Sequence, residues 1–274
     1  MDPLLELTAE IRARVPGLPR EGVTQLLGCV EGYGLFRDAQ GLHHRALSAM
    51  DGRWDLAPLI DHTLLKAEAT GTQVETLCSE ALAYGFASVC VNALWVPLAA
   101  SLLKGSAVRT CTVVGFPLGA SAFRAKAFEA EQALRDGAQE VDMVLAIGAA
   151  KAGDWAAIQR DFEGLRAAVP APAVLKVILE TCLLDDAEKV RACELADEAG
   201  LDFVKTSTGF STGGATEADV WLMRQTVGPR LGVKASGGIR NYEAALRMVR
   251  AGATRLGLSA SVAVVQGGTG SGPY

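Results

Sequence analysis

The chain contains 274 residues, of which half are apolar, 21% are charged and 6% are aromatic, and its formal net charge is −5. This length and composition predict one large domain, or one domain with an extension. Basic residues are not concentrated and aromatic residues are sparse, so we expect no nucleic-acid partner. No apolar run reaches the ~18 residues that a membrane span requires, so we also expect no membrane partner.

The cysteines and histidines indicate the cellular location of the protein and the cofactors it could bind. The six cysteines form no CxxC pair, and several lie in apolar strand or helix patterns, as buried thiols do. We therefore expect a reduced, cytoplasmic protein without a secretory signal. Three histidines are few for an ordinary zinc site, and no GxGxxG or Walker A motif occurs. The sequence thus predicts neither a metal site nor a cofactor.

Residues 1–56 do not follow the pattern of the rest of the chain. A short helix is expected over residues 3–15, whereas residues 34–54 are polar and are expected to be irregular. We interpret this segment as a partly helical extension. It is expected either to cover one end of the main domain or to join a subunit contact in a homodimer.

From about residue 57 onward, short apolar runs rich in β-branched residues alternate with longer stretches of helical periodicity. In the first helical stretch, Val74, Leu77 and Cys78 have the spacing of one helix face, and Thr72 with Glu75 has the pattern of a capping box. The eight short runs are residues 57–62, 87–91, 109–115, 140–145, 173–179, 202–207, 231–235 and 254–258.

Four glycines occur at the same position in the repeat, between a helical stretch and the next strand-like run. Each follows a helical stretch and precedes a strand-like run, where a residue with positive φ is favoured. The four glycines are Gly85, Gly137, Gly200 and Gly252. Five residues after each glycine comes a small or polar residue inside an apolar strand, and these are Cys90, Asp142, Lys205 and Gly257.

The alternating units predict a (β/α)8 barrel, of the TIM barrel type, over residues 57–265. The extension 1–56 precedes it, and a flexible Gly/Ser-rich tail is expected over residues 266–274. A doubly wound open sheet is the main alternative. In a barrel, catalytic residues lie at the C-terminal ends of the strands, so Asp142, Lys205 and Lys234 would converge on one cavity.

Two lysines lie inside strand-like segments, although lysine is among the residues least often buried. Lys205 occurs in DFVKTSTG and Lys234 in GVKASGG. One interpretation is that each side chain extends from a strand end into solvent. The functional interpretation is that burial and a neighbouring ammonium group together favour the free amine, which can then attack a carbonyl. The resulting protonated Schiff base accepts electrons from the adjacent carbon, and this chemistry needs no metal.

Asp142 lies between apolar neighbours in EVDMV, where a carboxylate must be paired or hydrogen-bonded. It is expected to form an ion pair with a lysine, to shuttle protons during carbinolamine formation and enamine protonation, or to do both. Lys176 is expected to support it through an ion pair with Asp142 or Glu180.

Four other residues are expected to have supporting roles. Asp61 is expected to hold substrate hydroxyl groups or the polar network. Cys90 and Asn92 end the second strand, where Cys90 is expected to line the core or the pocket. Thr206 follows Lys205 directly in the sequence.

A phosphate site is expected where the seventh and eighth strands end. Exposed backbone N–H groups in glycine-rich turns bind anions, and barrel phosphate sites usually arise from these two loops. The turn SGGIR at 236–240 leads to a helix after Asn241, a good N-cap residue, although it is also compatible with an ordinary βα turn. The expected phosphate-binding residues are Gly209, Gly237, Gly238, Arg240, Gly257 and Ser259.

Several motifs together resemble deoxyribose-phosphate aldolase. They are DHTLL at 61–65, VGFPLG at 114–119, EVDMV at 140–144, KVILET at 176–181, DFVKTSTGF at 202–210 and VKASGGIR at 233–240. The resemblance covers about residues 57–262. It implies a barrel and the reversible cleavage of 2-deoxy-D-ribose 5-phosphate to acetaldehyde and D-glyceraldehyde 3-phosphate. It also implies that Lys205 forms the Schiff base, with Asp142 and Lys234 as proton-transfer partners.

The sequence departs from this family pattern at two strand ends and has an unassigned terminus. Ala146 stands where many members have asparagine, and GLSA at 257–260 has fewer hydroxyls than is common, which predicts weaker phosphate binding. Tyr274 is either a loose terminus or, as in some family members, a phenol that folds back to assist proton transfer.

Two other functions fit the same residues. A transaldolase-like or different sugar-phosphate aldolase would share the lysine chemistry but use another donor. A barrel that only binds sugar phosphates, as a sensor or scaffold, would use the glycine turns without catalysis.

Overall fold

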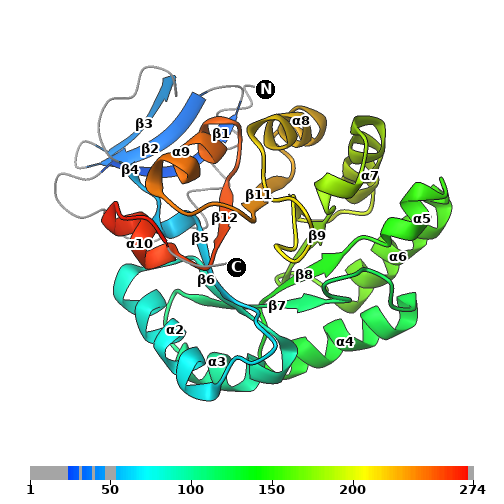
Figure 1. Ribbon diagram of the computed structural model, residues 1–274, viewed down its shortest axis with the longest axis horizontal. Helices are drawn as coiled ribbons and strands as arrows, with labels where there is room; N and C mark the ends of the chain where they lie inside the picture. The colour runs from blue at the N-terminus through cyan, green and yellow to red at the C-terminus, as the bar shows by residue number, and fades with distance from the viewer. Residues whose placement is uncertain (1–23, 31–32, 39–40, 47–53, 271–274) are drawn as a thin grey trace.

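The computed structural model describes residues 24–30, 33–38, 41–46 and 54–270, and these form two sheets. The larger sheet is a closed barrel in which β12 pairs with β5, and the smaller is a four-stranded sheet beside it (Figure 1). Every neighbouring pair of barrel strands is parallel. The predicted (β/α)8 barrel is therefore confirmed, and the open doubly wound sheet is excluded because the barrel has no edge strand.

The eight barrel strands match the eight apolar runs, although the first begins later because a short 3-10 helix, η2 (Ala57–Leu59), precedes it. The barrel strands are β5 (Ile60–Leu64), β6 (Ser88–Val91), β7 (Arg109–Val114), β8 (Glu140–Val144), β9 (Val174–Ile178), β10 (Phe203–Lys205), β11 (Gly232–Ser236) and β12 (Arg255–Leu258).

Helices surround the barrel and cover the outward faces of its strands (Figure 1). They are α2 (Gly71–Tyr84), α3 (Val96–Leu102), α4 (Phe123–Arg135), α5 (Ile147–Lys151), α6 (Trp155–Ala168), α7 (Asp186–Glu198), α8 (Glu217–Val227), α9 (Tyr242–Arg250) and α10 (Ser261–Gln266), with short 3-10 helices η3 (Ala93–Trp95) and η4 (Thr181–Leu183). Across the described residues, no helix combines the length and apolar character needed to cross a membrane.

Local sequence explains how α2 and α9 begin and which face of α2 is buried. Val74, Leu77 and Cys78 are buried, as the spacing predicts. The capping box is formed by Thr70 and Gln73, so the prediction of Thr72 with Glu75 was wrong by two residues. Asn241 caps α9 as predicted, because its Oδ1 accepts from the Ala244 backbone N–H at 2.9 Å.

The four punctuating glycines all have positive φ, which relieves the steric cost that another residue would carry there. Gly85 is the C-cap of α2 with φ 69°, and its N–H donates to the carbonyl of Ala81. The recurring glycine therefore marks the left-handed turn that ends a helix and leads into the next strand.

The N-terminal extension contains strands where irregular structure was expected. The small sheet has the order β3-β2-β1-β4 and consists of β1 (Thr24–Val30), β2 (Tyr33–Asp38), β3 (Gly41–Ala46) and β4 (Trp54–Asp55). The prediction for residues 34–54 was wrong because backbone pairing across β1, β2 and β3, rather than apolar alternation, defines these strands. The helix expected over residues 3–15 lies outside the described residues.

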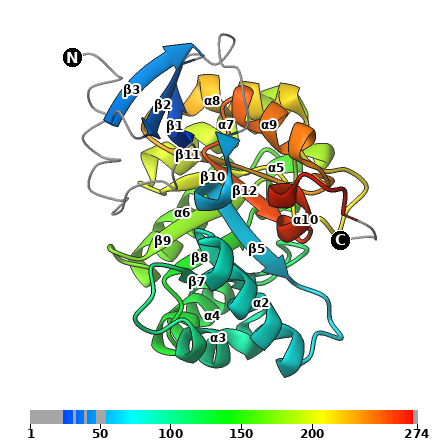
Figure 2. The same ribbon diagram turned by 90° about the vertical axis from the view of Figure 1, so that its left-hand side faces the viewer.

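The small sheet lies beside α9, outside the ring of barrel strands (Figure 1, Figure 2). The Trp54 backbone N–H donates to the Tyr242 hydroxyl at 2.5 Å, and the Arg250 guanidinium lies 5.7 Å from the centre of the Trp54 ring. At the other end of the chain, the Gly270 N–H donates to the Arg240 carbonyl at 2.8 Å. This part of the predicted tail is therefore tied to the turn that precedes α9, and Tyr274 lies outside the described residues.

Candidate active site

Four charged side chains converge inside the barrel because neighbouring strands place them at matching heights. Asp142 on β8 pairs in register with Lys176 on β9, and Lys205 on β10 pairs in register with Lys234 on β11. Their exposed fractions are 0% for Asp142, Lys176 and Lys234 and 1% for Lys205. The alternative that the two predicted lysines extend into solvent therefore does not hold.

Asp142 is the shared partner of the three lysines. Its Oδ2 accepts from Lys205 Nζ at 2.8 Å and from Lys234 Nζ at 2.7 Å. Its Oδ1 accepts from Lys176 Nζ at 2.7 Å. The three residues predicted to act together, Asp142, Lys205 and Lys234, are thus brought into direct contact.

Two more carboxylates and one guanidinium extend this network toward β5 and β12. Lys176 Nζ lies 2.6 Å from Glu140 Oε2, and Lys234 Nζ lies 2.5 Å from Asp61 Oδ2. Arg255 Nη1 lies 2.5 Å from Asp61 Oδ1 and 3.1 Å from Glu140 Oε2. Asp61 therefore belongs to the polar network, which is one of its two expected roles.

Sequence reasoning missed Glu140 and Arg255. Both could have been found by the alternation of strand residues, since Glu140 lies two residues before Asp142 and Arg255 two residues before Gly257. Cys111 was also missed; its Sγ donates to Asp142 Oδ1 at 3.3 Å.

The expected pairing of Lys176 with Asp142 is present, but the alternative pairing with Glu180 is absent from the described contacts. Glu180 instead accepts from the Thr208 hydroxyl and from the Thr208 N–H at 3.3 Å. It adopts φ 57° at the end of β9, which turns its carboxylate toward the loop after β10 rather than toward Lys176.

The network shifts the pKa of each carboxylate downward. Burial would raise the pKa of Asp142, but the ammonium groups of Lys176, Lys205 and Lys234 outweigh burial and hold it well below its usual range. Burial likewise opposes ionisation of Asp61 and Glu140, yet Arg255 and the buried lysines lower the pKa of both. All three carboxylates therefore remain charged at neutral pH.

Two of the three lysines are held in the charged form. Burial would lower the pKa of Lys234, but Asp142 and Asp61 raise it well above its ordinary value. Burial is likewise outweighed at Lys176, where Asp142, Cys111 and Glu140 raise the pKa. The anions that keep these two ammonium groups charged are the same ones that bind them.

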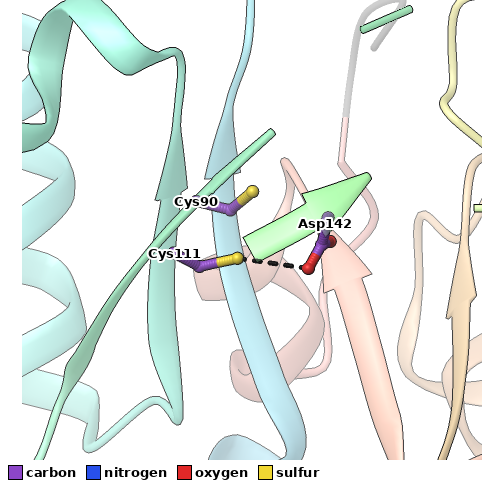
Figure 3. A group of neighbouring side chains, drawn as sticks. All are labelled: Cys90, Cys111 and Asp142. Carbon is purple, nitrogen blue, oxygen red and sulfur yellow. Dashed lines mark hydrogen bonds between the residues drawn. The ribbon is translucent and has the colours of Figure 1, made fainter. Parts of the chain in front are cut away.

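Cys90 and Cys111 lie side by side on β6 and β7, and Cys111 points toward Asp142 (Figure 3). The neighbouring Cys111 thiol lowers the pKa of Cys90, while burial raises the pKa of Cys111. The two sulfurs and a carboxylate oxygen of Asp142 lie within 4.8 Å of one another, as metal ligands can. A bound cation would have to compete with the three ammonium groups that Asp142 already binds.

A cavity of about 740 Å³ opens at the C-terminal ends of β10, β11, β12 and β5. Its lining includes all six residues predicted for phosphate binding, namely Gly209, Gly237, Gly238, Arg240, Gly257 and Ser259. The backbone at Gly237 and Gly238 has φ 86° and 78°, a conformation that favours glycine. The structure thus places the predicted phosphate residues around one opening.

Two of the supporting residues connect neighbouring barrel strands through hydrogen bonds. The Asn92 side-chain amide donates to the Leu65 carbonyl at 3.1 Å, which ties the end of β6 to the end of β5. The Thr206 hydroxyl donates to the Ser236 carbonyl at 3.1 Å and so links β10 to β11. The Thr206 backbone N–H also donates to the Lys234 carbonyl at 3.0 Å, whereas Asn92 has no described contact with Asp142 or the lysines.

Known proteins share this fold and much of this sequence. A deoxyribose-phosphate aldolase of Geobacillus sp. (strain WCH70) is 56% identical over 220 residues, which are 80% of this chain and 99% of that protein. One of Clostridium perfringens (strain SM101 / Type A) is 57% identical over 80% of this chain and 98% of that protein.

Solved structures give the same result. The tetrameric deoxyribose phosphate aldolase of Aeropyrum pernix is 37% identical, with a TM-score of 0.72 over 77% of this chain and 89% of that one. A structure from Coccidioides immitis is 36% identical, with a TM-score of 0.76 over 97% of this chain and 96% of that one.

The family model described as DeoC/LacD family aldolase matches residues 56–267, which contain the whole barrel and every residue of the network inside it. The chain is therefore a member of the DeoC/LacD family of aldolases.

Proposed function

We propose that this aldolase reversibly cleaves 2-deoxy-D-ribose 5-phosphate to acetaldehyde and D-glyceraldehyde 3-phosphate through a Schiff base on Lys205. The observation that carries the proposal is the sharing of one carboxylate oxygen, Asp142 Oδ2, by the ammonium groups of Lys205 and Lys234. The names of the relatives support the substrate, and the cavity lined by the glycine turns supports a phosphate group at the other end.

Charge balance supports the availability of one free amine. Inside the barrel four cations, Lys176, Lys205, Lys234 and Arg255, face three carboxylates, Asp61, Glu140 and Asp142. A further cation, Arg109, lies 3.6 Å from Glu140, but its side chain is 41% exposed and solvent screens its charge. The network therefore carries one positive charge more than negative when every group is ionised. Loss of one proton from one amine removes this excess, and desolvation favours that loss inside the barrel.

Lys205 has the fewest anionic partners of the three lysines, which favours it as the nucleophile. Among the described residues it contacts a single carboxylate, Asp142, whereas Lys176 and Lys234 each contact at least two. The pKa values of Lys176 and Lys234 are raised, so these two remain ammonium groups. Lys205 is also the only one of the three with any exposed surface.

The proposed reaction is the Schiff-base chemistry that the sequence predicts for a lysine aldolase, and it needs no metal. The Lys205 amine attacks the C1 aldehyde to give a carbinolamine, which loses water to form a protonated imine. A base removes the proton of the C3 hydroxyl, the C2–C3 bond breaks, and its electrons pass to the imine to give an enamine. Glyceraldehyde 3-phosphate leaves, the enamine takes a proton at C2, and hydrolysis releases acetaldehyde. Asp142 and Lys234 are proposed to move these protons.

The phosphate is proposed to bind at the cavity mouth. Backbone N–H groups of the Gly237–Gly238 turn and the hydroxyl of Ser259 are suited to an anion, and Arg240 adds positive charge nearby. Arg240 and Ser259 are exposed, which is consistent with a subsite open to solvent.

Product analysis separates this function from its rivals. With 2-deoxy-D-ribose 5-phosphate, we expect equimolar acetaldehyde and glyceraldehyde 3-phosphate from the wild-type chain and none from Lys205→Met. Turnover only with a ketose donor would favour the transaldolase-like alternative. Binding of sugar phosphate without turnover by the wild-type chain would favour the non-catalytic alternative.

We propose that the chain forms a homodimer in a reducing, cytoplasmic environment, which is consistent with the free thiols of Cys78, Cys90, Cys111, Cys182 and Cys193. Analytical ultracentrifugation of the full chain measures its oligomeric state, and the tetrameric relative from Aeropyrum pernix provides the comparison.

A further inference from the structure

Ser236 carries a buried hydroxyl group that has no partner among the described residues. Its side chain is 0% exposed, and its Oγ makes no hydrogen bond there. Buried polar groups are nearly always hydrogen-bonded, so an orphaned hydroxyl beside an active site points to a ligand that completes it. This hydroxyl is not used by any step of the mechanism above.

The position of Ser236 follows from the barrel register. It lies two residues after Lys234 on β11, so both side chains point into the barrel, and Ser236 lies roughly 6–7 Å closer to the mouth. The next two residues, Gly237 and Gly238, line the cavity. Ser236 therefore lies between the reactive lysines and the proposed phosphate subsite.

The neighbouring strand leaves space for this hydroxyl. Gly257 on β12 pairs in register with Ser236 and lines the cavity. A Cβ at Gly257 would overlap Ser236 Oγ and lie 3.1 Å from Lys234 Cε. The missing side chain at this glycine thus creates the room in which the Ser236 hydroxyl and the Lys234 stem lie together.

We propose that Ser236 is a specificity-determining residue that hydrogen-bonds the C4 hydroxyl of the pentose phosphate, which is the C2 hydroxyl of the acceptor aldehyde. This inference rests on the proposed function, which puts C1 at Lys205 and the C5 phosphate at Gly237 and Gly238. Between those ends the substrate carries two hydroxyl groups. The C3 hydroxyl must lie beside the proton-transferring groups around Asp142, which leaves the C4 hydroxyl, next to the phosphate-bearing carbon, for Ser236.

Ser207 is the nearest rival for this role. It is also buried and its hydroxyl has no partner among the described residues. Its Cβ, however, lies 3.5 Å from the place a Cβ would take on Gly237, so it packs beneath the phosphate turn. The Ser236 hydroxyl instead lies over Gly257, in the space that Lys234 Cε also borders, which favours Ser236 as the residue facing the carbon chain.

A comparison of two acceptors tests the proposal. Aldol addition of acetaldehyde is measured with D-glyceraldehyde 3-phosphate and with 3-oxopropyl phosphate, which lacks only the C2 hydroxyl. Ser236→Ala should lower kcat/KM for glyceraldehyde 3-phosphate about 10- to 100-fold and change that for 3-oxopropyl phosphate by no more than about twofold. Equal losses with both acceptors, or no loss with either, would overturn the role of Ser236.

Stability provides an independent readout. Removing an unsatisfied buried hydroxyl should leave the thermal midpoint of Ser236→Ala equal to or above that of the wild type. The matched control is Thr112→Val, whose buried hydroxyl donates to the Val91 carbonyl at 2.8 Å, and its midpoint should fall while both acceptors keep their relative rates. A midpoint for Ser236→Ala that falls as far as the control would show a structural role.

The proposed function and this inference fail in different ways. If the wild-type chain adds acetaldehyde to neither acceptor, the proposed function is wrong and the role of Ser236 falls with it. If the wild type prefers glyceraldehyde 3-phosphate and Ser236→Ala keeps that preference, the proposed function stands and only the role of Ser236 is refuted.

Discussion

The ammonium groups of Lys205 and Lys234 bind the same carboxylate oxygen, at 2.8 and 2.7 Å, in the buried interior of the barrel. Two cations that share one oxygen repel each other, and this repulsion is relieved when one of them loses its proton. Lys234 has a second carboxylate, Asp61, at 2.5 Å, whereas the described part of the chain gives Lys205 none. Lys234 therefore has the two carboxylates that hold an ammonium group in its charged form, and this difference supports the proposed role of Lys205 as the nucleophile.

Replacement of Lys234 by methionine should remove the reason for Lys205 to lose its proton. The network would then contain three cations and three carboxylates, so a charged Lys205 would be balanced. We expect kcat to fall by about 10²- to 10⁴-fold. Steady-state kinetics measure this, with Lys189→Met as the control, because Lys189 pairs with Asp186 and Asp219 outside the barrel interior. A similarly large fall in kcat for the Lys189→Met control would contradict the charge argument.

Asp142→Asn should destabilise the fold in a pH-dependent way. At neutral pH it leaves three buried ammonium groups without their shared anion, at a cost of about 3–5 kcal/mol. The pKa of Asp142 is lowered in the folded state, so its stabilisation is present above the unfolded pKa of about 3.9 and is lost as the pH falls toward the folded value. Urea unfolding of both proteins at pH 7 and below pH 4 should show the difference shrinking; a difference that grows in acid would refute this sign.

Arg255 and Glu140 should be energetically coupled because Nη1 of the half-buried Arg255 lies 3.1 Å from Oε2 of the fully buried Glu140. Either Arg255→Met or Glu140→Gln alone leaves a buried charge with fewer partners, whereas the double variant removes both. We expect a coupling energy of about 1–3 kcal/mol from a double-mutant cycle of unfolding free energies. Additive effects would mean that Asp61 alone balances Arg255.

His62 should make the protein less stable in acid. Its Nδ1 lies 2.8 Å from Ser261 Oγ and its Nε2 lies 2.8 Å from Glu80 Oε2, so it joins β5 to α10 and α2. Burial lowers the pKa of His62, against the opposing effect of Glu80. At about pH 6.5, the pKa of histidine in an unfolded chain, the unfolded protein therefore binds more protons than the folded protein. The stabilisation by neutral His62 is consequently lost as the pH falls.

The variant His62→Gln tests that sign. At pH 8 it should cost about 1 kcal/mol through the lost hydrogen bonds. The difference in unfolding free energy between the variant and the wild type, measured by urea unfolding, should become smaller as the pH is lowered from 8 to 5.5. A gap that widens in acid would show that the ion pair with Glu80 dominates over burial.

The sequence predicted the barrel well because its signal is local and repeated. An apolar run recurs in each of the eight units, and a glycine with positive φ precedes four of these runs. Alternation within a strand then placed Asp142, Lys205 and Lys234 on inward faces. Their meeting could be expected from barrel topology, since strand ends of a barrel point to one cavity.

The parts that sequence reasoning missed depend on contacts between distant segments. Glu140 and Arg255 are 115 residues apart, and only the register across the barrel shows that they meet. The shift of the capping box arose because two Thr-x-x-Gln/Glu patterns overlap, and the structure uses Thr70 with Gln73. The strands of the N-terminal sheet are defined by their pairing partners, which composition does not reveal.

Borohydride trapping during turnover tests the central claim most directly. The wild-type chain is mixed with 2-deoxy-D-ribose 5-phosphate and sodium borohydride, digested, and examined by mass spectrometry. We predict one reduced adduct on the peptide that contains Lys205, and no adduct in Lys205→Met. An adduct on Lys176 or Lys234 in the wild type, or undiminished turnover without any adduct, would contradict the account.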